Sequence, residues 1–269
     1  VYSTSSTSVD INVSTNRIFR DPSAFYHFVV AVDTTQSTAA DRVKIYVNGV
    51  QETSLKNYQG STVVYPGQNN NTFMNVTTAE NRIGARGGSY PFKGLMSHIH
   101  FIDGTQYAAS DFGESDSVSG IWKPKTAPSV TYGTNGFFLK FENSGNMDLD
   151  SSGNNLTFST SGTLTQNVDT PSNNFATWNP ISTAVARSGG TFANGNTTHT
   201  TVATKFNGIP ATLGMSSGKY YFEVKWSSGS DVEAIIGIQS AERTADDQEL
   251  GHYATDYGYY SNNGNIRSN

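Results

Sequence analysis

The sequence contains no cysteine, little charge and no long hydrophobic run, and each absence excludes a class of protein. Without cysteine there is no disulfide, no thiolate metal ligand and no cysteine nucleophile. Charged residues make up 14% of the chain, and its net charge of −5 comes without a basic cluster, so we expect no nucleic-acid partner. No apolar stretch approaches the roughly 18 residues of a membrane-spanning helix, so we expect no membrane insertion.

The residues that are present favour a β protein. Hydrophobic residues account for only 35% of the chain, so its surface must be covered largely by Ser, Thr, Asn, Gln and Gly. That composition is typical of turn-rich β proteins with thin cores. A length of 269 residues is comfortable for two domains of ordinary size. We therefore predict an all-β protein with two domains in tandem.

Alternation of apolar and polar residues, which is typical of half-buried strands, recurs along the chain, whereas helical periodicity is nearly absent. Between residues 43 and 47 every second residue is Val or Ile, so these side chains share one face. Asn48 and Gly49 follow directly and predict a type I′ hairpin, because both central positions of that turn need positive φ. Residues 25–32 are apolar on both faces, which predicts a central strand covered on both sides.

Other segments carry the same signals. One short helical turn is expected at residues 110–114, with the Ser110 hydroxyl capping backbone N–H groups. From about residue 143 to 180 the chain is polar and rich in turn residues, which indicates closing strands and then a linker. Further strands are predicted at residues 95–102, 137–142, 219–226 and 234–238, the last of them buried.

The first half of the chain contains the segments FYHFVVAVD (25–33), VKIYVNGV (43–50), RIG (82–84), FKGLM (92–96), FIDG (101–104), DFG (111–113) and GIWKP (120–124). Together they resemble the laminin-G-like, concanavalin-type jelly roll, in which a W/F-Y-H strand precedes an asparagine–glycine hairpin and a later pair of strands. The resemblance implies a jelly-roll domain over residues 1–145 that lacks the family's opening strands. This variant is similar to proteins found among tail-fibre and structural genes of marine phages.

The second half is similar to the first part of a SPRY-type sandwich. The resemblance implies a SPRY-like β-sandwich over residues 186–269, whose later strands would lie beyond Asn269, with residues 146–185 forming closing strands and a linker. It rests on GKYYFEV (218–224), IGI (236–238) and YGYY (257–260).

Both resemblances imply binding rather than chemistry. We expect a non-enzymatic segment of a bacteriophage tail fibre or adhesin, located in the virion or outside the cell, that recognises a host-surface glycan or protein. By analogy it would form a homo-oligomer, a trimer in phage fibres, or contact other virion proteins. A purely structural virion or decoration protein and a glycan-degrading enzyme are the alternatives.

An enzyme is the least expected of these. Glycosidases need two carboxylates held across the sugar bond, and on this fold they usually come from one strand reading E-x-D-x-x-E. No such run exists, and the nearest pattern, between Asp111 and Asp116, is expected in a turn. The motifs G-x-S-x-G, H-E-x-x-H and the Walker loop are also absent.

A sugar-binding surface needs aromatic faces beside amide and charged groups on loops, and the turn-rich loops of the first domain offer both. The alternative is that these tyrosines simply cover the edge of the sandwich. The candidates are Tyr58, Tyr65, Asn70, Arg86 and Tyr90.

Two clusters could hold a metal ion. Asp148, Asp150 and Asn154 place oxygen ligands around a glycine turn, faintly like a calcium loop, but without the bidentate glutamate of an EF-hand. A hydrogen-bonded Asx turn is the alternative. His98 and His100 would share a face of their strand, yet no third ligand is nearby, so we interpret them as half-buried strand histidines. Apart from calcium, no cofactor is expected.

Overall fold

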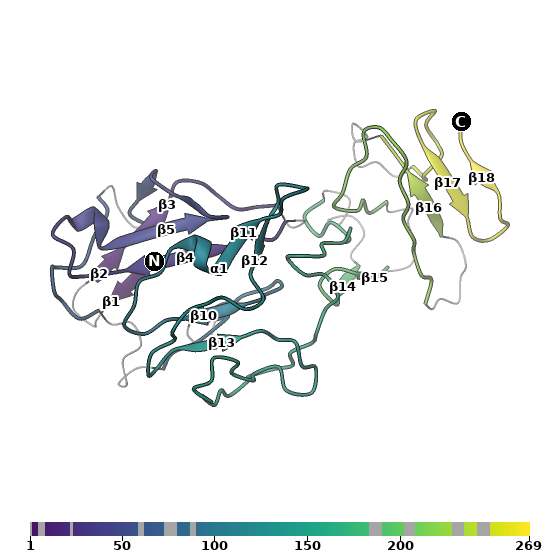
Figure 1. Cartoon of the computed structure of the whole chain (residues 1–269). Helices are drawn as coiled ribbons and strands as arrows, with labels where there is room; N and C mark the ends of the chain where they lie inside the picture. The colour runs from purple at the N-terminus through teal and green to yellow at the C-terminus, as the bar shows by residue number, and fades with distance from the viewer. Residues whose placement is uncertain are drawn as a thin grey trace. The chain divides into compact units, whose positions relative to one another are not determined.

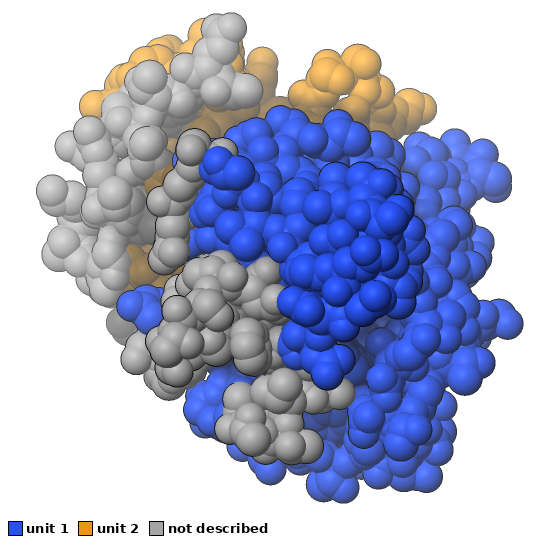
Figure 2. All heavy atoms as spheres, turned by 90° about the vertical axis from the view of Figure 1, so that its left-hand side faces the viewer, with its two compact units in different colours: residues 1–174 blue, residues 175–269 orange. Residues whose placement is uncertain are grey.

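The computed structural model shows an all-β protein that divides into two compact units, unit 1 (Val1–Asn174) and unit 2 (Phe175–Asn269), coloured blue and orange in Figure 2. Unit 1 thus includes residues 146–174, which the sequence assigned to the closing strands and linker. The structure describes residues 2–4, 9–21, 24–58, 62–72, 80–86, 90–182, 190–201, 208–227, 234–240 and 248–269.

The strands pair antiparallel throughout the described chain (Figure 1). In unit 1 the sheets are β1–β2, β3–β7, β4–β5–β6, β8–β9, β10–β13 and β11–β12. Their bounds are β1 Tyr2–Thr4, β2 Val9–Asn12, β3 Ser14–Thr15, β4 Phe28–Val32, β5 Val43–Val47, β6 Val50–Gln51, β7 Leu55–Lys56, β8 Ala85–Arg86, β9 Tyr90–Pro91, β10 Ile99–Phe101, β11 Gly113–Ser115, β12 Trp122–Pro124 and β13 Phe137–Leu139. A 3₁₀ turn, η1 Ala39–Asp41, precedes β5, and a short helix, α1 Ala109–Phe112, precedes β11.

Unit 2 contains two small sheets. β14 (Thr191–Ala193) pairs with β15 (Thr198–Thr200) in one of them. The other has the order β16–β17–β18, with bounds Ile235–Ile238, Tyr257–Tyr260 and Ile266–Arg267. The YGYY and IGI segments of the sequence therefore lie side by side in this sheet.

The hairpin predicted at Asn48 and Gly49 is confirmed. β5 and β6 pair through Val47 and Val50, and the two turn residues have φ values of 48° and 80°. Every second side chain of β5 is buried, as the alternation requires. The Asn48 side chain also accepts a hydrogen bond from the His27 backbone N–H at 2.8 Å, which fixes the turn against the segment before β4.

The core of unit 1 forms where β5 meets the β2–β3 segment. Ile11 and Val13 are fully buried and pack against Val43 and Ile45. This core therefore joins the β2–β3 segment to β5, two segments that lie far apart in the sequence. Partly buried side chains that surround it are Val32, Leu55, Val63 and Tyr65.

The strand predicted at residues 25–32 is shorter and more exposed than expected. β4 begins at Phe28 and pairs with β5, and within the described residues it is the edge of its sheet. Phe28 and Val30 are consequently about half exposed, at 50% and 45%. The Phe28 ring is partly covered by an edge-on contact with Phe19 at 4.9 Å.

Two further predictions are corrected in detail. The helical turn exists but begins at Ala109, and the Asp111 carboxylate, rather than the Ser110 hydroxyl, accepts the hydrogen bond from the Ala108 backbone N–H at 2.7 Å. The strand predicted at 95–102 is reduced to β10, because His98 has a φ of 51°. A left-handed residue interrupts the pleat, so extended pairing starts only after it.

The strand predicted at residues 219–226 does not form in unit 2. Its alternating pattern needs a neighbouring strand, and the structure records no backbone hydrogen bond from this segment within the described chain. β16 exists but is not buried, since Ile238 is 42% exposed. Exposed apolar side chains of the unpaired segment, hereafter the apolar strip, are Tyr220, Tyr221, Phe222, Val224 and Trp226.

Candidate functional site

The residues expected to bind sugar separate into exposed and buried groups. Tyr58 and Tyr90 are 67% and 70% exposed, so each ring presents a face to solvent. Tyr65 instead packs against the core of unit 1, in the covering role that was the alternative for these tyrosines. Asn70 is exposed, and its backbone N–H donates to the Gly67 carbonyl in a tight turn.

One pair of these residues is brought together by a hairpin. Arg86 in β8 and Tyr90 in β9 are direct cross-strand partners. The Arg86 side chain itself lies outside the described part of the structure.

The proposed calcium ligands form a network of hydrogen bonds. Both carboxylate oxygens of buried Asp150 are occupied: Oδ1 accepts from the Phe138 and Ser152 backbone N–H groups, at 3.0 and 2.9 Å, and Oδ2 accepts from the Ser152 hydroxyl and the Leu156 N–H, at 2.9 and 3.0 Å. Burial opposes the charge, but these hydrogen bonds outweigh it and hold the pKa of Asp150 below its ordinary value.

The Asn154 amide group is occupied by other contacts. Asn154 donates both its amide hydrogens, to the Gly133 carbonyl at 2.7 Å and the Gly136 carbonyl at 2.8 Å, while Asp148 is partly exposed. The bond from Ser152 N–H to Asp150 is the Asx turn that was the alternative reading. In the described part of the chain, no three His, Asp or Glu side chains gather as a possible metal site.

The β11–β12 hairpin is the best-organised polar surface of unit 1. Its two faces differ because side chains alternate along each strand. Trp122 points inward: its indole N–H donates to His27 Nδ1 at 2.9 Å, and the two rings stack at 5.9 Å. The ring also lies so close to Gly49 and Gly113 that a Cβ at either position would overlap it.

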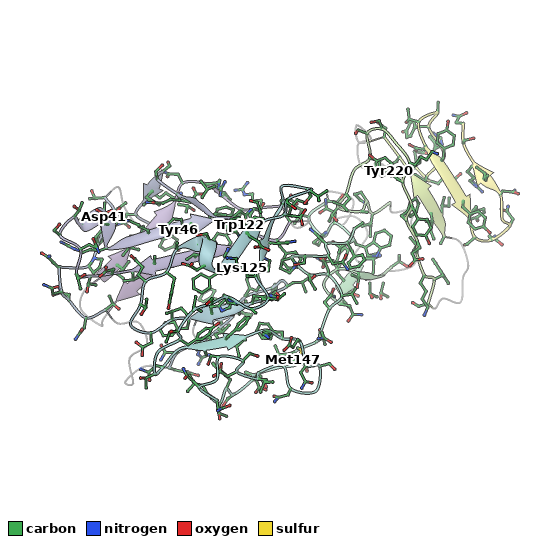
Figure 3. All side chains as sticks on the ribbon, viewed as in Figure 1. Asp41, Tyr46, Trp122, Lys125, Met147 and Tyr220 are labelled. Carbon is green, nitrogen blue, oxygen red and sulfur yellow. The ribbon has the colours of Figure 1, made fainter. Side chains whose placement is uncertain are left out.

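The outward face of the same hairpin carries charged side chains. Glu114 lies directly opposite Lys123, and Lys125 follows two residues later on the same side. Lys125 donates from Nζ to the Ser110 carbonyl at 2.7 Å, and this hydrogen bond connects its side chain to α1 (Lys125 is labelled in Figure 3). These side chains border a groove of about 360 Å³, lined by Glu114, Lys123, Pro124, Lys125, Thr126, Ala127 and Ser172.

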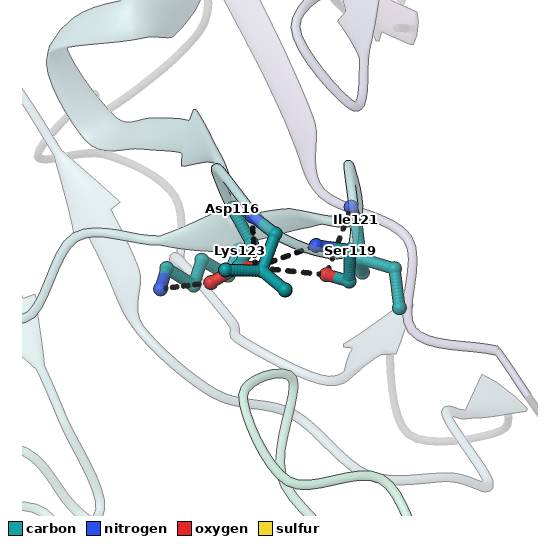
Figure 4. Close-up of polar contacts among 5 residues, drawn as sticks. Asp116, Ser119, Ile121 and Lys123 are labelled. Atoms are coloured by element: carbon teal, nitrogen blue, oxygen red, sulfur yellow. Dashed lines mark hydrogen bonds and ion pairs between the residues drawn. The ribbon is translucent and has the colours of Figure 1, made fainter.

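The turn of this hairpin is closed by Asp116 (Figure 4). Its Oδ1 accepts hydrogen bonds from the Val118 and Ser119 backbone N–H groups and from the Ser119 hydroxyl, at 2.9–3.0 Å. Its Oδ2 accepts from Lys123 Nζ at 2.8 Å. The Lys123 hydrogen bond, followed by the turn donors, lowers the pKa of Asp116, and the same bond raises the pKa of Lys123. Both groups are therefore charged across the physiological range, and the ion pair fixes one end of the groove.

Beneath the hairpin, three histidines lie among aromatic rings. Burial, with smaller repulsion from His98 and His27, lowers the pKa of His100 to about 3. Burial likewise lowers the pKa of His27 and of His98. His100 Nδ1 shares a 2.9 Å hydrogen bond with the Tyr132 hydroxyl, and its ring stacks on Phe138 at 3.9 Å. Imidazoles packed in this way are part of the interior. His100 is a half-buried strand histidine as expected, whereas His98 lies before β10 rather than within a strand.

The groove was missed at the sequence level. The alternation Trp122-Lys123-Pro124-Lys125 is visible in the sequence, but the position of Glu114 opposite Lys123 depends on the register between two strands. The approach of Ser172, which lies almost 50 residues beyond Lys125, depends on the tertiary fold. A hairpin predicted with its turn at residues 116–121 would have placed Glu114 opposite Lys123, but it would not have brought Ser172 to the groove.

Comparison with known proteins adds no further assignment. No family model, no curated protein and no solved structure matches the chain. Within the described residues, no helix is long and apolar enough to cross a bilayer. We therefore infer the function of the chain from its residues and their geometry.

Proposed function

We propose that this chain is a non-enzymatic segment of a bacteriophage tail fibre or adhesin, with a laminin-G-like jelly roll followed by a SPRY-like sandwich. Its role is to recognise a glycan or protein on the host surface. The observation that carries the proposal is the exposure of two tyrosine rings, Tyr58 and Tyr90, on a unit whose core is packed. Exposed aromatic faces on a rigid scaffold are what shallow recognition of sugars and peptides requires.

Weak sites of this kind gain strength from repetition. A shallow surface with few polar anchors binds one ligand weakly, whereas several copies on one particle bind a dense receptor layer tightly. We therefore expect the chain to act as a homo-oligomer, trimeric by analogy with phage fibres, in the virion or outside the cell.

The carboxylates of unit 1 support binding over glycoside hydrolysis. Hydrolysis needs two carboxyl groups on opposite sides of the sugar bond. Asp111 accepts a hydrogen bond at the helix start, and Asp116 is occupied by the turn and Lys123. Glu114 is the one acidic residue that lines the β11–β12 groove, so this groove lacks the second carboxylate.

A glycan array probed with the chain displayed on a multivalent support tests the proposal. We expect retention of a subset of glycans and a loss of about tenfold or more when Tyr58→Ala and Tyr90→Ala are combined. Tyr259→Ala is the matched control, because Tyr259 is 55% exposed in unit 2. Retention of no glycan and of no host-surface protein would overturn the proposal, and unchanged binding by the double variant would remove the tyrosines from the site.

The apolar strip of unit 2 favours a second candidate, a structural role in the virion. Its five side chains are 41–84% exposed, and monomeric soluble proteins rarely expose contiguous apolar patches of this kind (Tyr220 is labelled in Figure 3). Such a surface joins virion parts or copies of the chain. Sedimentation velocity separates the two roles: if association is through the strip, Phe222→Asp with Trp226→Asp yields monomers, while the glycan array signal per bound chain is retained.

A further inference from the structure

We propose that the β11–β12 groove binds an uncharged sugar residue through its hydroxyl groups, an inference that rests on the proposed recognition of host glycans. The groove has a volume of about 360 Å³, within the size range of small-ligand sites. It lies on the outward face of a hairpin whose inward face is anchored by Trp122.

The hairpin holds the polar groups of the groove at fixed positions. Asp116 closes the turn with three bonds to residues 118 and 119 and fixes Lys123 through the ion pair. On the other side, the Lys125 backbone N–H donates to the Phe112 carbonyl at 2.8 Å, which extends the strand pairing by one residue. Lys123 and Lys125 are therefore held before a ligand arrives, and less binding free energy is lost to ordering these two side chains.

Donors and acceptors in the groove match a pair of hydroxyls. Each hydroxyl of a sugar can donate one hydrogen bond and accept others. Glu114 provides the acceptor, and no hydrogen bond to its carboxylate is recorded within the described residues. Lys125 uses one of its three N–H donors on Ser110 and keeps two, so hydroxyls of one bound sugar can donate to Glu114 and accept from Lys125.

The charge balance selects an uncharged ligand. Lys123 is neutralised by Asp116, and the charge of Lys125 is balanced by Glu114 in the same groove. No net positive field is left to offset the desolvation of an anionic sugar, and Glu114 would repel its carboxylate. The exposed Ala127 side chain adds apolar surface that suits the C–H face of a neutral sugar ring.

The experiment is an amide-detected NMR titration of the full chain with methyl glycosides of glucose, galactose and mannose, and with methyl glucuronoside as the anionic probe. We expect one or more neutral glycosides to shift amide signals of residues 113–127, with a dissociation constant on the order of millimolar. Glu114→Gln and Lys125→Met should each weaken this binding about tenfold. Lys93→Met, at an exposed position of unit 1 outside the groove lining, should leave it unchanged.

Each other outcome has a distinct meaning. Amide shifts elsewhere, or binding unaffected by both variants, would overturn the groove as the site while leaving glycan recognition intact. Tighter binding of the glucuronoside, strengthened by Glu114→Gln, would overturn the uncharged class. Absence of shifts with every glycoside overturns the groove, and the glycan array then decides separately whether recognition itself fails. Spectra of the free variants that match the parent outside the groove show that each still folds.

Discussion

The two units are built from the same kind of sequence but bury very different amounts of it. Among the described residues, the buried hydrophobic side chains lie in unit 1, except for Tyr260 in unit 2. Unit 1 packs Val43 and Ile45 onto Ile11 and Val13, whereas unit 2 leaves its apolar strip open. Alternation alone therefore does not make a strand; a strand also needs a neighbour that satisfies its backbone.

This difference bears on the proposed roles of the two units. A packed unit can hold a surface rigidly, as Trp122 and Asp116 hold the β11–β12 hairpin of unit 1. An open apolar surface is suited to burial against another chain, because burying it releases about 25 cal/mol per Å². Unit 1 is thus the candidate for recognition, and unit 2 the candidate for assembly.

The sharpest test of the comparison is a matched pair of truncations, one in each unit. Ile45→Ala, at a position 5% exposed, should lower the free energy of unfolding of unit 1 by about 2–5 kcal/mol. Phe222→Ala, at a position 49% exposed, should change that of unit 2 by less than about 1 kcal/mol. Denaturant unfolding followed by hydrogen exchange reports on the two units separately. Equal losses in both would mean that the strip is packed, and the comparison would fail.

A second pair contrasts two glycines with similar positive φ. Gly49 (φ 80°) is covered by the Trp122 ring, whereas Gly264 (φ 74°) has only the Tyr259 hydroxyl at 3.7 Å. Gly49→Ala combines backbone strain with overpacking and should cost about 2–4 kcal/mol. Gly264→Ala carries the backbone strain alone, about 1 kcal/mol. Thermal unfolding of the two variants measures the difference, and similar costs would remove Trp122 from the explanation.

Acid should loosen unit 1 through His100. Its pKa in the fold is lowered to about 3 from an ordinary value of 6.5, so the folded state holds the neutral form. Stability is then fully present above pH 6.5 and is lost as the pH falls from 6.5 toward 3, by up to about 1.4 kcal/mol per pH unit. His100→Phe should make the pH profile of the unfolding midpoint less steep without flattening it, because burial also lowers the pKa of His27 and of His98. A profile as steep in this variant as in the parent chain would contradict the assignment.

The smallest expected effect is that of calcium on unit 1. Because both Asp150 oxygens already accept backbone or hydroxyl donors, a calcium ion would have to displace them. We expect millimolar calcium to leave the unfolding temperature unchanged, with magnesium as the control. A calcium-specific rise would restore Asp148, Asp150 and Asn154 as ligands.

Local features of the fold could be predicted, and distant ones could not. The β5–β6 hairpin follows from alternation and two turn residues that are adjacent in the sequence. The stacking of Trp122 on His27 joins residues 95 positions apart, and no local pattern encodes it. The strand predicted at 219–226 had the right alternation, but its pairing depends on residues elsewhere.

The same limit applies to the candidate site. Exposure of Tyr58 and Tyr90 could be guessed from their turn-rich surroundings, and Tyr65 could not be told apart from them, because only the folded core shows that it is covered. The Asp150 network was foreseen as a turn because Asx turns are local, although the bond from Phe138 N–H is not.

The most direct test of the account is to incubate the chain with a glycan that it retains and to weigh the glycan by mass spectrometry afterwards. We predict that the glycan is bound and recovered at its original mass, because Glu114 is the one acidic side chain among the described residues that line the β11–β12 groove. Shortened oligosaccharides, produced in proportion to the amount of chain and lost in Glu114→Gln, would contradict it.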